Sequence, residues 1–461
     1  MNNPNRRPAR NSTPNNHSRQ ADAVPGLAAR KAATKLLAAV IDAKTSLDGL
    51  TDHDHGHPQF RALDMRDRGL VRAILTTALR FRGTIEALIT ARLDRPLPAN
   101  AHTLSHILHV GAAQMLFLDV PDSAAVDLAV TQAKDDPRTS RFSGVVNGIL
   151  REISRRKERA LPAVLEKNAN APEWFVERLV RDYGDEQARL ILEAHRTEAP
   201  VDLTVKSDPE GWAEKLGGIA LPTGTVRLNS FEGSVTELEG FADGEWWVQD
   251  AAASIPAQLF GDIKGLRVAD LCAAPGGKTA QLAQAGAKVT ALELSPNRAK
   301  RLAANLERLK LEAEIVTSDL FAYEPKELFD AVLLDAPCSS TGTVRRHPDV
   351  PWTKSPEDIA KLAGLQGRML LHAAKFLKPG GTIIFSNCSL DAEEGEMLVA
   401  AVLADHSQLV AAPFAPGEFV FCDPFLTSDG AVRTTPAGLD MGTPALSGLD
   451  GFFAARLRKA G

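Results

Sequence analysis

The spacing of apolar residues changes along this chain, and that change restricts the available folds more than any other feature of the sequence. Between residues 26 and 159, apolar residues recur at helical intervals, and prolines divide this stretch into roughly five or six expected helices. After Val248, short β-rich runs alternate with helical segments, which is the pattern of a parallel, doubly wound sheet. The sequence therefore predicts an α/β domain of the Rossmann-like type, preceded by an all-helical domain.

Five strands of the predicted sheet can be placed from runs of β-branched and other apolar residues. We expect them at residues 267–271, 288–293, 313–317, 330–335 and 382–386. Two connecting helices carry start signals, because Ser295 and Ser355 are each followed by proline, and Asp358 completes a capping box. The second of these helices is predicted to stop at Gly380 and Gly381.

The chain has 461 residues, 44% hydrophobic and 24% charged, which is long enough for two or three soluble domains. We divide it into a disordered basic tail, a helical domain, a small α+β linker domain and a doubly wound domain, at residues 1–25, 26–160, 161–245 and 246–461. The Asn and Pro content of the tail argues against a mitochondrial presequence, the alternative for this segment. Within the linker, we expect helices at residues 173–183 and 186–194, and a strand at residues 201–205.

Charge is distributed unevenly along the chain. Residues 1–160 hold 24 Lys+Arg against 16 Asp+Glu, whereas the remainder holds 29 against 42, and the net charge is −5. A basic segment beside an acidic body is typical of a module that contacts phosphates, although a solvated surface has the same composition. There is no run of 18 apolar residues and no apolar N-terminal stretch, so we expect a cytoplasmic protein without membrane insertion. A monomer is favoured, but the sequence does not decide the oligomeric state.

The cysteines and histidines do not predict a metal site. The four cysteines lie far apart without a C-x-x-C pair, so neither a zinc site nor a disulfide framework is expected. His53, His55 and His57 offer metal-binding side chains, but they lie in a polar stretch that ends in Pro58. A solvated loop is the better interpretation of that stretch.

The first predicted strand of the sheet runs into a loop of small residues. The loop reads Asp-Leu-Cys-Ala-Ala-Pro-Gly-Gly-Lys-Thr over residues 270–279, so its backbone can approach a ligand closely. The following helix N-terminus favours a negatively charged group such as a carboxylate. A phosphate-binding loop ending at Thr279 would require glycine at position 272, where the chain has Cys272. The nucleoside-triphosphate interpretation therefore fails by one residue.

Acidic and thiol side chains follow the other predicted strands. Glu293 closes the second strand about twenty residues after the loop, where an acid binds the ribose of an adenosine-containing cofactor, and Asp319 can accept from the adenine amino group. Asp335 and Cys338 follow the fourth strand, and Cys388 follows the fifth. Because neighbouring strand ends open onto one crevice, we expect the two thiols to meet. Buried, inert cysteine is the alternative for each of them.

These motifs, in this order, resemble the NOL1/NOP2/Sun family of RNA cytosine-5 methyltransferases. The resemblance lies in the loop at residues 270–279, in Asp-Ala-Pro-Cys-Ser from Asp335, and in Asn-Cys-Ser around Cys388, and it extends to residues 249–254 and 451–456. The helical stretch with Arg-Asp-Arg from Arg66 and similar short motifs at residues 111–115 and 147–151 resembles the NusB-like domain fused to one bacterial branch. That branch methylates 16S ribosomal RNA.

The resemblance implies an enzyme that transfers a methyl group from S-adenosylmethionine to C5 of a cytosine in RNA, with 16S ribosomal RNA as the expected partner. It implies catalytic roles for Cys388 as nucleophile, Asp335 at the base edge and Cys338 in proton removal from C5 and enzyme release. The implied cofactor contacts are Cys272, Ala273, Ala274, Pro275, Gly276, Gly277, Lys278, Glu293, Asp319 and Asp335. Glu293 stands where aspartate is commoner, and Asn387 where threonine often precedes the nucleophile.

Two other functions remain open at this point. A DNA cytosine-5 methyltransferase would use the cysteine of a Pro-Cys pair, here Cys338, and would not need Cys388. An RNA-binding or antitermination factor with a decayed cofactor site would not retain both glycines of the loop, Asp335 and both cysteines. The intact motifs favour the RNA methyltransferase.

Overall fold

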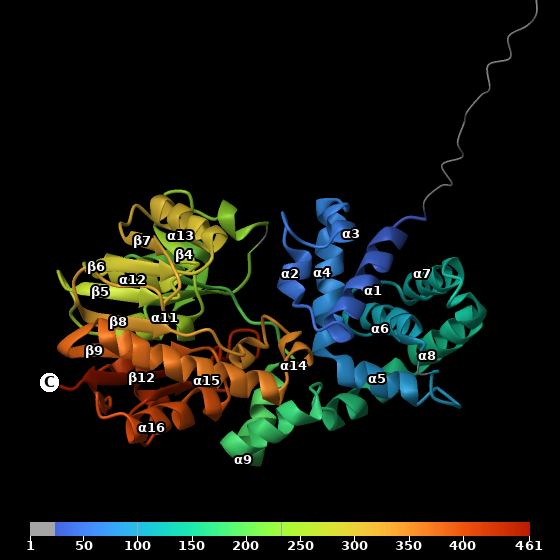
Figure 1. Cartoon of the computed structure of the whole chain (residues 1–461). Helices are drawn as coiled ribbons and strands as arrows, with labels where there is room; N and C mark the ends of the chain where they lie inside the picture. The colour runs from blue at the N-terminus through green and yellow to red at the C-terminus, as the bar shows by residue number, and fades with distance from the viewer. Residues whose placement is uncertain (1–23, 99, 232) are drawn as a thin grey trace, which may run out of the picture.

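A computed structural model describes residues 24–98, 100–231 and 233–461 (Figure 1). The predicted basic tail lies outside the described residues except for its last two positions. None of the helices in the described ranges combines the length and apolar character that a membrane span requires.

The first part of the described chain is entirely helical. Eight α-helices occur there instead of the predicted five or six, because two helices of five and four residues in the polar stretch are too short to produce a periodic pattern. The helices are α1 (Leu27–Ile41), α2 (Leu47–Thr51), α3 (Pro58–Arg61), α4 (Met65–Arg80), α5 (Arg82–Thr90), α6 (His102–Phe117), α7 (Asp122–Asp135) and α8 (Ser143–Lys167). The helix α6 is buried along most of its length and forms the centre of this bundle.

A long helix and a small antiparallel sheet follow. The helix α9 (Glu173–Ala194) is interrupted by the non-helical Gly184, which separates the two predicted helices. The sheet has the order β2-β3-β1-β4, and its strand β1 (Asp202–Val205) agrees with the prediction. The other elements are α10 (Pro209–Leu216), β2 (Gly218–Ala220), β3 (Thr225–Leu228) and β4 (Trp246–Val248). Strand β4 pairs with β1 although it lies beyond residue 245.

The last part is an eight-stranded sheet with the order β10-β12-β9-β8-β5-β6-β7, in which β11 also pairs with β12. The five predicted strands are all present and parallel, as the doubly wound prediction required. The strands are β5 (Arg267–Leu271), β6 (Lys288–Glu293), β7 (Glu314–Thr317), β8 (Phe329–Asp335), β9 (Leu377–Asn387), β10 (Leu409–Ala411), β11 (Val432–Thr434) and β12 (Phe452–Lys459). Strand β12 runs antiparallel to β9, so the complete sheet is mixed.

Helices connect and cover these strands (Figure 1). They are α11 (Ala251–Gln258), α12 (Gly277–Gln284), α13 (Pro296–Leu309), α14 (Val350–Thr353), α15 (Pro356–Ala373) and α16 (Glu396–Asp405). The predicted starts are confirmed, because Ser295 caps α13 and Ser355 forms a capping box with Asp358 on α15.

The predicted end of α15 at Gly380 and Gly381 is wrong. The helix ends at Ala373, and both glycines lie within β9. Pairing with β8 shifts register here, and Gly380 has a φ of 74°, which a residue with a side chain rarely adopts. The glycines therefore allow an irregularity in the strand instead of a helix stop.

The helical bundle is joined to the segment that follows β8. Trp352 on α14 packs against the helical core, and its indole Nε1 donates to the carbonyl of Leu79 at 3.2 Å. The carboxylate of Asp349 accepts the backbone N–H of Leu47 at 2.9 Å. The residues between Cys338 and Trp352 therefore connect the large sheet to the bundle.

Candidate active site

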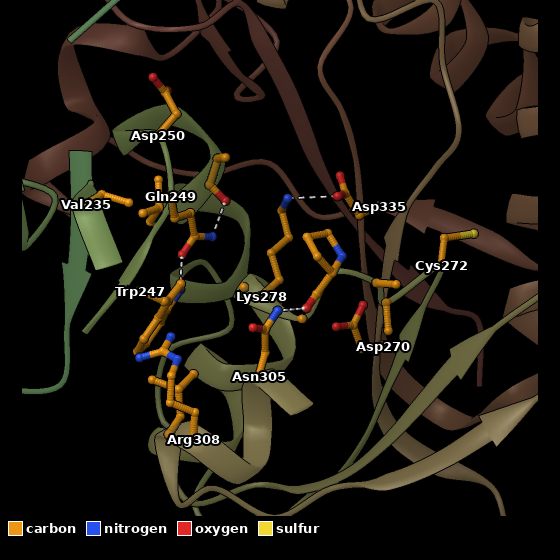
Figure 2. Close-up of a pocket in the computed structure, with 18 of the residues that line it drawn as sticks. Val235, Trp247, Gln249, Asp250, Asp270, Cys272, Lys278, Asn305, Arg308 and Asp335 are labelled. Atoms are coloured by element: carbon orange, nitrogen blue, oxygen red, sulfur yellow. Dashed lines mark hydrogen bonds and ion pairs between the residues drawn. The ribbon is translucent and has the colours of Figure 1, made fainter. Parts of the chain in front are cut away.

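The loop after β5 forms one wall of a cavity of about 520 Å³ (Figure 2). Residues 272–277 and Lys278 line it, together with Asp270 and Asp335 at the ends of their strands. Gly276 caps α12 with a φ of 108°, and a Cβ there would lie 2.5 Å from the side chain of Leu302. The positive φ therefore favours glycine at this position, because residues with a side chain rarely adopt it.

Asp270 lies at the base of this cavity and was given no role in the sequence analysis. One carboxylate oxygen accepts the hydroxyl of Thr279 at 2.6 Å, and the other, Oδ1, has no hydrogen-bond partner although the residue is 1% exposed. Burial raises the pKa of Asp270 to about 7. A buried, unpartnered acceptor beside a cavity suits a cationic or hydrogen-bond-donating ligand.

The two acids predicted at the ribose and adenine lie in different environments. Glu293 is 2% exposed, and its carboxylate accepts the backbone N–H groups of Ala274 at 3.3 Å and Ser295 at 2.9 Å. Asp319 is exposed and accepts the backbone N–H of Phe321 at 2.9 Å. Neither acid is among the residues that line the 520 Å³ cavity. Glu293 holds the loop after β5 through two backbone N–H groups, whereas Asp319 holds only the turn that follows β7, through one.

Lys278 and Asp335 form an ion pair at the carboxyl end of β8. The Lys278 ammonium lies 2.7 Å from Oδ2 of Asp335, as Figure 2 shows, and 4.8 Å from the ring centre of Phe452. The hydroxyl of Ser386, at the end of β9, donates to Oδ1 of Asp335 at 3.0 Å. The sequence analysis placed Lys278 among the cofactor contacts without detecting this pair, because the two residues are 57 positions apart.

The two thiols predicted to meet do so: the Sγ atoms of Cys338 and Cys388 are 3.4 Å apart. The hydrogen bond between the two thiols lowers the pKa of Cys388, and the same bond, together with burial, raises the pKa of Cys338 well above its usual value. The hydroxyl of Ser340 lies 3.6 Å from Sγ of Cys388 and lowers its pKa further. Cys388 is therefore the thiol that ionises more readily, and Cys338 is the one that keeps its proton.

The remaining cysteines differ from this pair. Burial raises the pKa of Cys272 to about 12 and that of Cys422 to about 11. Neither thiol forms a thiolate near neutral pH. Cys272 lines the cavity of about 520 Å³, whereas Cys338 and Cys388 are not among its lining residues.

A second group of charges lines the cavity beyond Lys278. The Arg346 guanidinium binds Asp250 at 2.6 Å and Asp450 at 3.2 Å. Sequence reasoning missed this group, although Asp250 lies in one of the motifs that carried the resemblance and Asp450 directly precedes another. These three side chains form a further wall of the cavity.

The histidines of the polar stretch do not gather into a metal site. His53 and His55 are exposed, and Nδ1 of His57 accepts the backbone N–H of Gln59 at 3.2 Å. Within residues 24–98, 100–231 and 233–461, no cluster of three or more metal-binding side chains was found.

A parallel sheet with a small-residue loop at its first strand, an acid at its second and a helical NusB-like domain before it defines a Rossmann-like methyltransferase of two principal domains. The family model described as 16S rRNA methyltransferase RsmB/F matches residues 262–458, and the NusB family model matches residues 27–155. The chain belongs to the RsmB/F family of methyltransferases, which confirms the resemblance seen in the sequence.

Individual relatives agree with this assignment. Ribosomal RNA small subunit methyltransferase B of Xylella fastidiosa is 36% identical over 449 residues, which cover 94% of this chain and 98% of that protein. The protein of the same name from Klebsiella pneumoniae is 34% identical over 415 residues, 86% of this chain and 90% of its own length. The crystal structure of PH0851 shares the fold, with a TM-score of 0.68 and 22% identity over 95% of this chain and 99% of that one.

Proposed function

We propose that this chain transfers a methyl group from S-adenosylmethionine to C5 of a cytosine in 16S ribosomal RNA, through a covalent bond between Cys388 and C6 of the base. The observation that carries the proposal is the pair of thiols 3.4 Å apart, with opposite pKa shifts, beside the Lys278–Asp335 ion pair. The names of the relatives from Xylella fastidiosa and Klebsiella pneumoniae support ribosomal RNA as the substrate.

The residues around the cavity suit S-adenosylmethionine, which supplies the methyl group when bound. The loop at residues 272–278 offers backbone groups and small side chains, and the unpartnered oxygen of Asp270 suits a positively charged ligand. Glu293 would hold the ribose, since each carboxylate oxygen can accept a second hydrogen bond. Asp319 is exposed at the end of β7 and would accept the adenine amino group.

Methylation at C5 needs a nucleophile on C6, because C5 of cytosine alone is too weakly nucleophilic. The Cys388 thiolate adds to C6, the electron pair of the C5–C6 double bond attacks the methyl carbon, and the methyl–sulfur bond of the donor breaks. Asp335 holds the N3 and amino edge of the base, and Lys278 offsets negative charge that develops on the ring.

Product release requires a base, and the same two thiols can provide it in sequence. Once Cys388 is bonded to C6, it carries no charge and no longer accepts the Cys338 proton, so the largest cause of the raised Cys338 pKa, the hydrogen bond to Cys388, and the repulsion by the Cys388 charge are both weakened, while burial remains. Cys338 can then lose its proton to solvent and remove the proton from C5. The C5–C6 double bond re-forms, the bond from C6 to sulfur breaks, and Cys388 leaves as a thiolate.

The surroundings of the two thiols support this assignment over the DNA-type alternative, in which Cys338 would attack. Besides the hydrogen bond that the thiols share, Lys278 lowers the pKa of Cys388, whereas burial and the Glu394 charge raise the pKa of Cys338, and the better nucleophile is the thiolate.

Bisulfite sequencing of ribosomal RNA from the source organism tests the proposal. Deleting the gene should remove 5-methylation at a cytosine of 16S ribosomal RNA, and the intact gene should restore it. A gene that encodes Cys388→Ala should not restore it. An unchanged methylation pattern in 16S ribosomal RNA after deletion would reject this substrate.

A further inference from the structure

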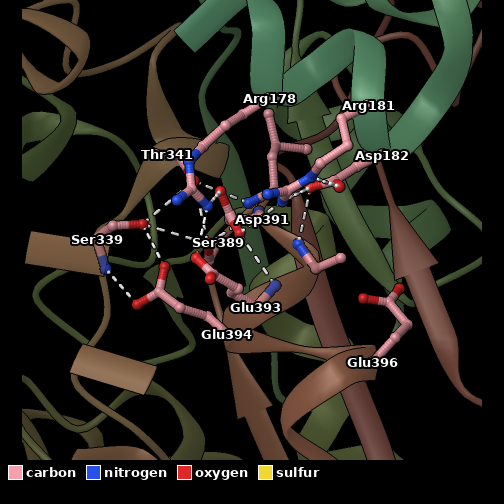
Figure 3. A network of polar contacts seen from close by, with 12 residues as sticks. Arg178, Arg181, Asp182, Ser339, Thr341, Ser389, Asp391, Glu393, Glu394 and Glu396 are labelled. Carbon is pink, nitrogen blue, oxygen red and sulfur yellow. Dashed lines mark hydrogen bonds and ion pairs between the residues drawn. The ribbon is translucent and has the colours of Figure 1, made fainter. Parts of the chain in front are cut away.

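A buried carboxylate and three hydroxyl groups form a polar cluster that includes Ser339 and Ser389 (Figure 3). Ser339 follows one cysteine and Ser389 follows the other, and their hydroxyl oxygens are 3.2 Å apart. The hydroxyl of Thr341 lies 3.3 Å from the first and 3.1 Å from the second, which closes a ring of three. The side chain of Glu394 is fully buried at one side of this hydroxyl ring.

Three donors converge on the Glu394 carboxylate. Ser339 donates through its backbone N–H at 2.9 Å and through its hydroxyl, and Nε2 of Gln366 donates at 2.8 Å. Burial raises the pKa of Glu394 above its usual value, and the hydrogen bonds that it accepts limit this rise. All three partners donate to the carboxylate, so its negative charge is held against Ser339, the residue that follows Cys338.

The backbones of the two loops are joined as well. The N–H of Gly342 donates to the carbonyl of Cys388 at 2.9 Å, and the N–H of Leu390 donates to the hydroxyl of Thr341 at 2.9 Å. These bonds alone do not distinguish one thiol from the other. The Glu394 carboxylate distinguishes them, because it accepts hydrogen bonds from Ser339, the residue that follows Cys338.

We propose, building on the proposed function, that Glu394 is a positioning residue of the two-thiol site. It ties the Cys338 loop to the Cys388 loop and keeps the proton that the two thiols share on Cys338. When Cys388 ionises, its own proton leaves to solvent, and one proton remains between the two sulfurs. A negative charge beside Cys338 disfavours a second negative charge there. The raised pKa of Cys338 agrees with this, since its causes are the bond to Cys388, burial, the Cys388 charge and then Glu394.

The neighbouring Glu393 provides a matched control. Its carboxylate binds Arg178 of α9 at 2.7 Å and makes no contact with the hydroxyl ring (Figure 3). Glu393→Gln therefore removes the same charge from the adjacent position of the same loop, without touching the residues that follow the cysteines.

Alkylation of the full chain by iodoacetamide, with each cysteine quantified by peptide mass spectrometry, tests the proposal. In the unmodified chain Cys388 should react in preference to Cys338. Glu394→Gln should raise the share of alkylation at Cys338 roughly tenfold, the effect of about one pKa unit from a neighbouring charge. Glu393→Gln should leave the share unchanged. An unchanged share in Glu394→Gln would overturn the inference.

A second variant covers the case in which Glu394→Gln does not fold. Ser339→Ala keeps the charge and removes one of the links to the Cys388 loop. It should weaken the bond between the thiols and raise the pH at which Cys388 becomes reactive, so an unchanged pH midpoint would overturn the tie between the loops. If Cys388→Ala still methylates RNA, the proposed function fails instead, and the two failures are distinguishable.

Discussion

Replacing Trp352 with alanine tests whether the helical bundle holds the segment that leads away from Cys338. The indole Nε1 donates to Leu79, and the Arg82 guanidinium lies 5.6 Å from the ring centre. Truncating a fully buried Trp costs about 3–5 kcal/mol, so for this half-buried side chain we expect about 2 kcal/mol, or roughly thirtyfold in the docking equilibrium.

Because the chain keeps the two parts covalently joined, the loss should appear as loosening of residues 340–353. Amide hydrogen exchange in this segment should accelerate by up to roughly thirtyfold. The kcat for RNA methylation should fall, whereas the affinity for S-adenosylmethionine should not change, because the cofactor loop follows β5. Trp212→Ala removes a half-buried Trp from α10, which packs against the small sheet, and serves as the control. Normal exchange and normal kcat in Trp352→Ala would refute the reasoning.

Three further predictions concern the cofactor and the RNA. Asp319→Ala should weaken the binding of S-adenosylmethionine in calorimetry and leave the melting temperature unchanged. Glu293→Ala should lower both the affinity and the melting temperature, because Glu293 is buried and holds two backbone N–H groups. Unchanged affinity in the two variants would reject these contacts. Affinity for S-adenosylmethionine should rise as the pH increases through about 7, since the ionised Asp270 attracts a cation better than the neutral acid does. Asp270→Asn should abolish this rise. A pH-independent affinity in the unmodified chain would contradict the role of Asp270. Affinity for RNA should fall steeply as the salt concentration rises. Replacing the exposed Arg151, Arg155 and Arg159 of α8 with glutamine should reduce the slope of log affinity against log salt concentration by roughly 0.9 for each phosphate that these side chains neutralise. An unchanged slope would show that the RNA binds elsewhere.

The sequence located the central strands because each is a short run of β-formers between turn residues. Strands β5 and β6 have the predicted bounds, and the others differ by a few residues at their ends. Strand β12 contains most of the C-terminal motif at residues 451–456, but its antiparallel place beside β9 depends on pairing between distant segments, which local patterns do not contain. The same limit explains Gly380, whose positive φ occurs in a strand irregularity as well as at a helix end.

In the candidate site, too, some contacts could be predicted from the sequence and others could not. The meeting of Cys338 with Cys388 was predictable, because neighbouring parallel strands end at one edge of the sheet. The Lys278–Asp335 pair and the burial of Glu394 were not, since each depends on where a loop side chain turns after its strand or helix ends. Glu293 was expected to bind a ribose, and the sequence did not indicate that its carboxylate is buried and also holds the loop after β5.

Trapping of protein–RNA adducts by the two cysteine variants tests the covalent mechanism most directly. With labelled RNA and S-adenosylmethionine, Cys338→Ala should add to C6, transfer the methyl group and then stall, which leaves a retarded band on a denaturing gel. Cys388→Ala should bind both ligands and give neither adduct nor product, and the double variant should lose the band. If Cys388→Ala gives the trapped band instead, the roles of the thiols are reversed, and if both variants remain active, the mechanism is wrong.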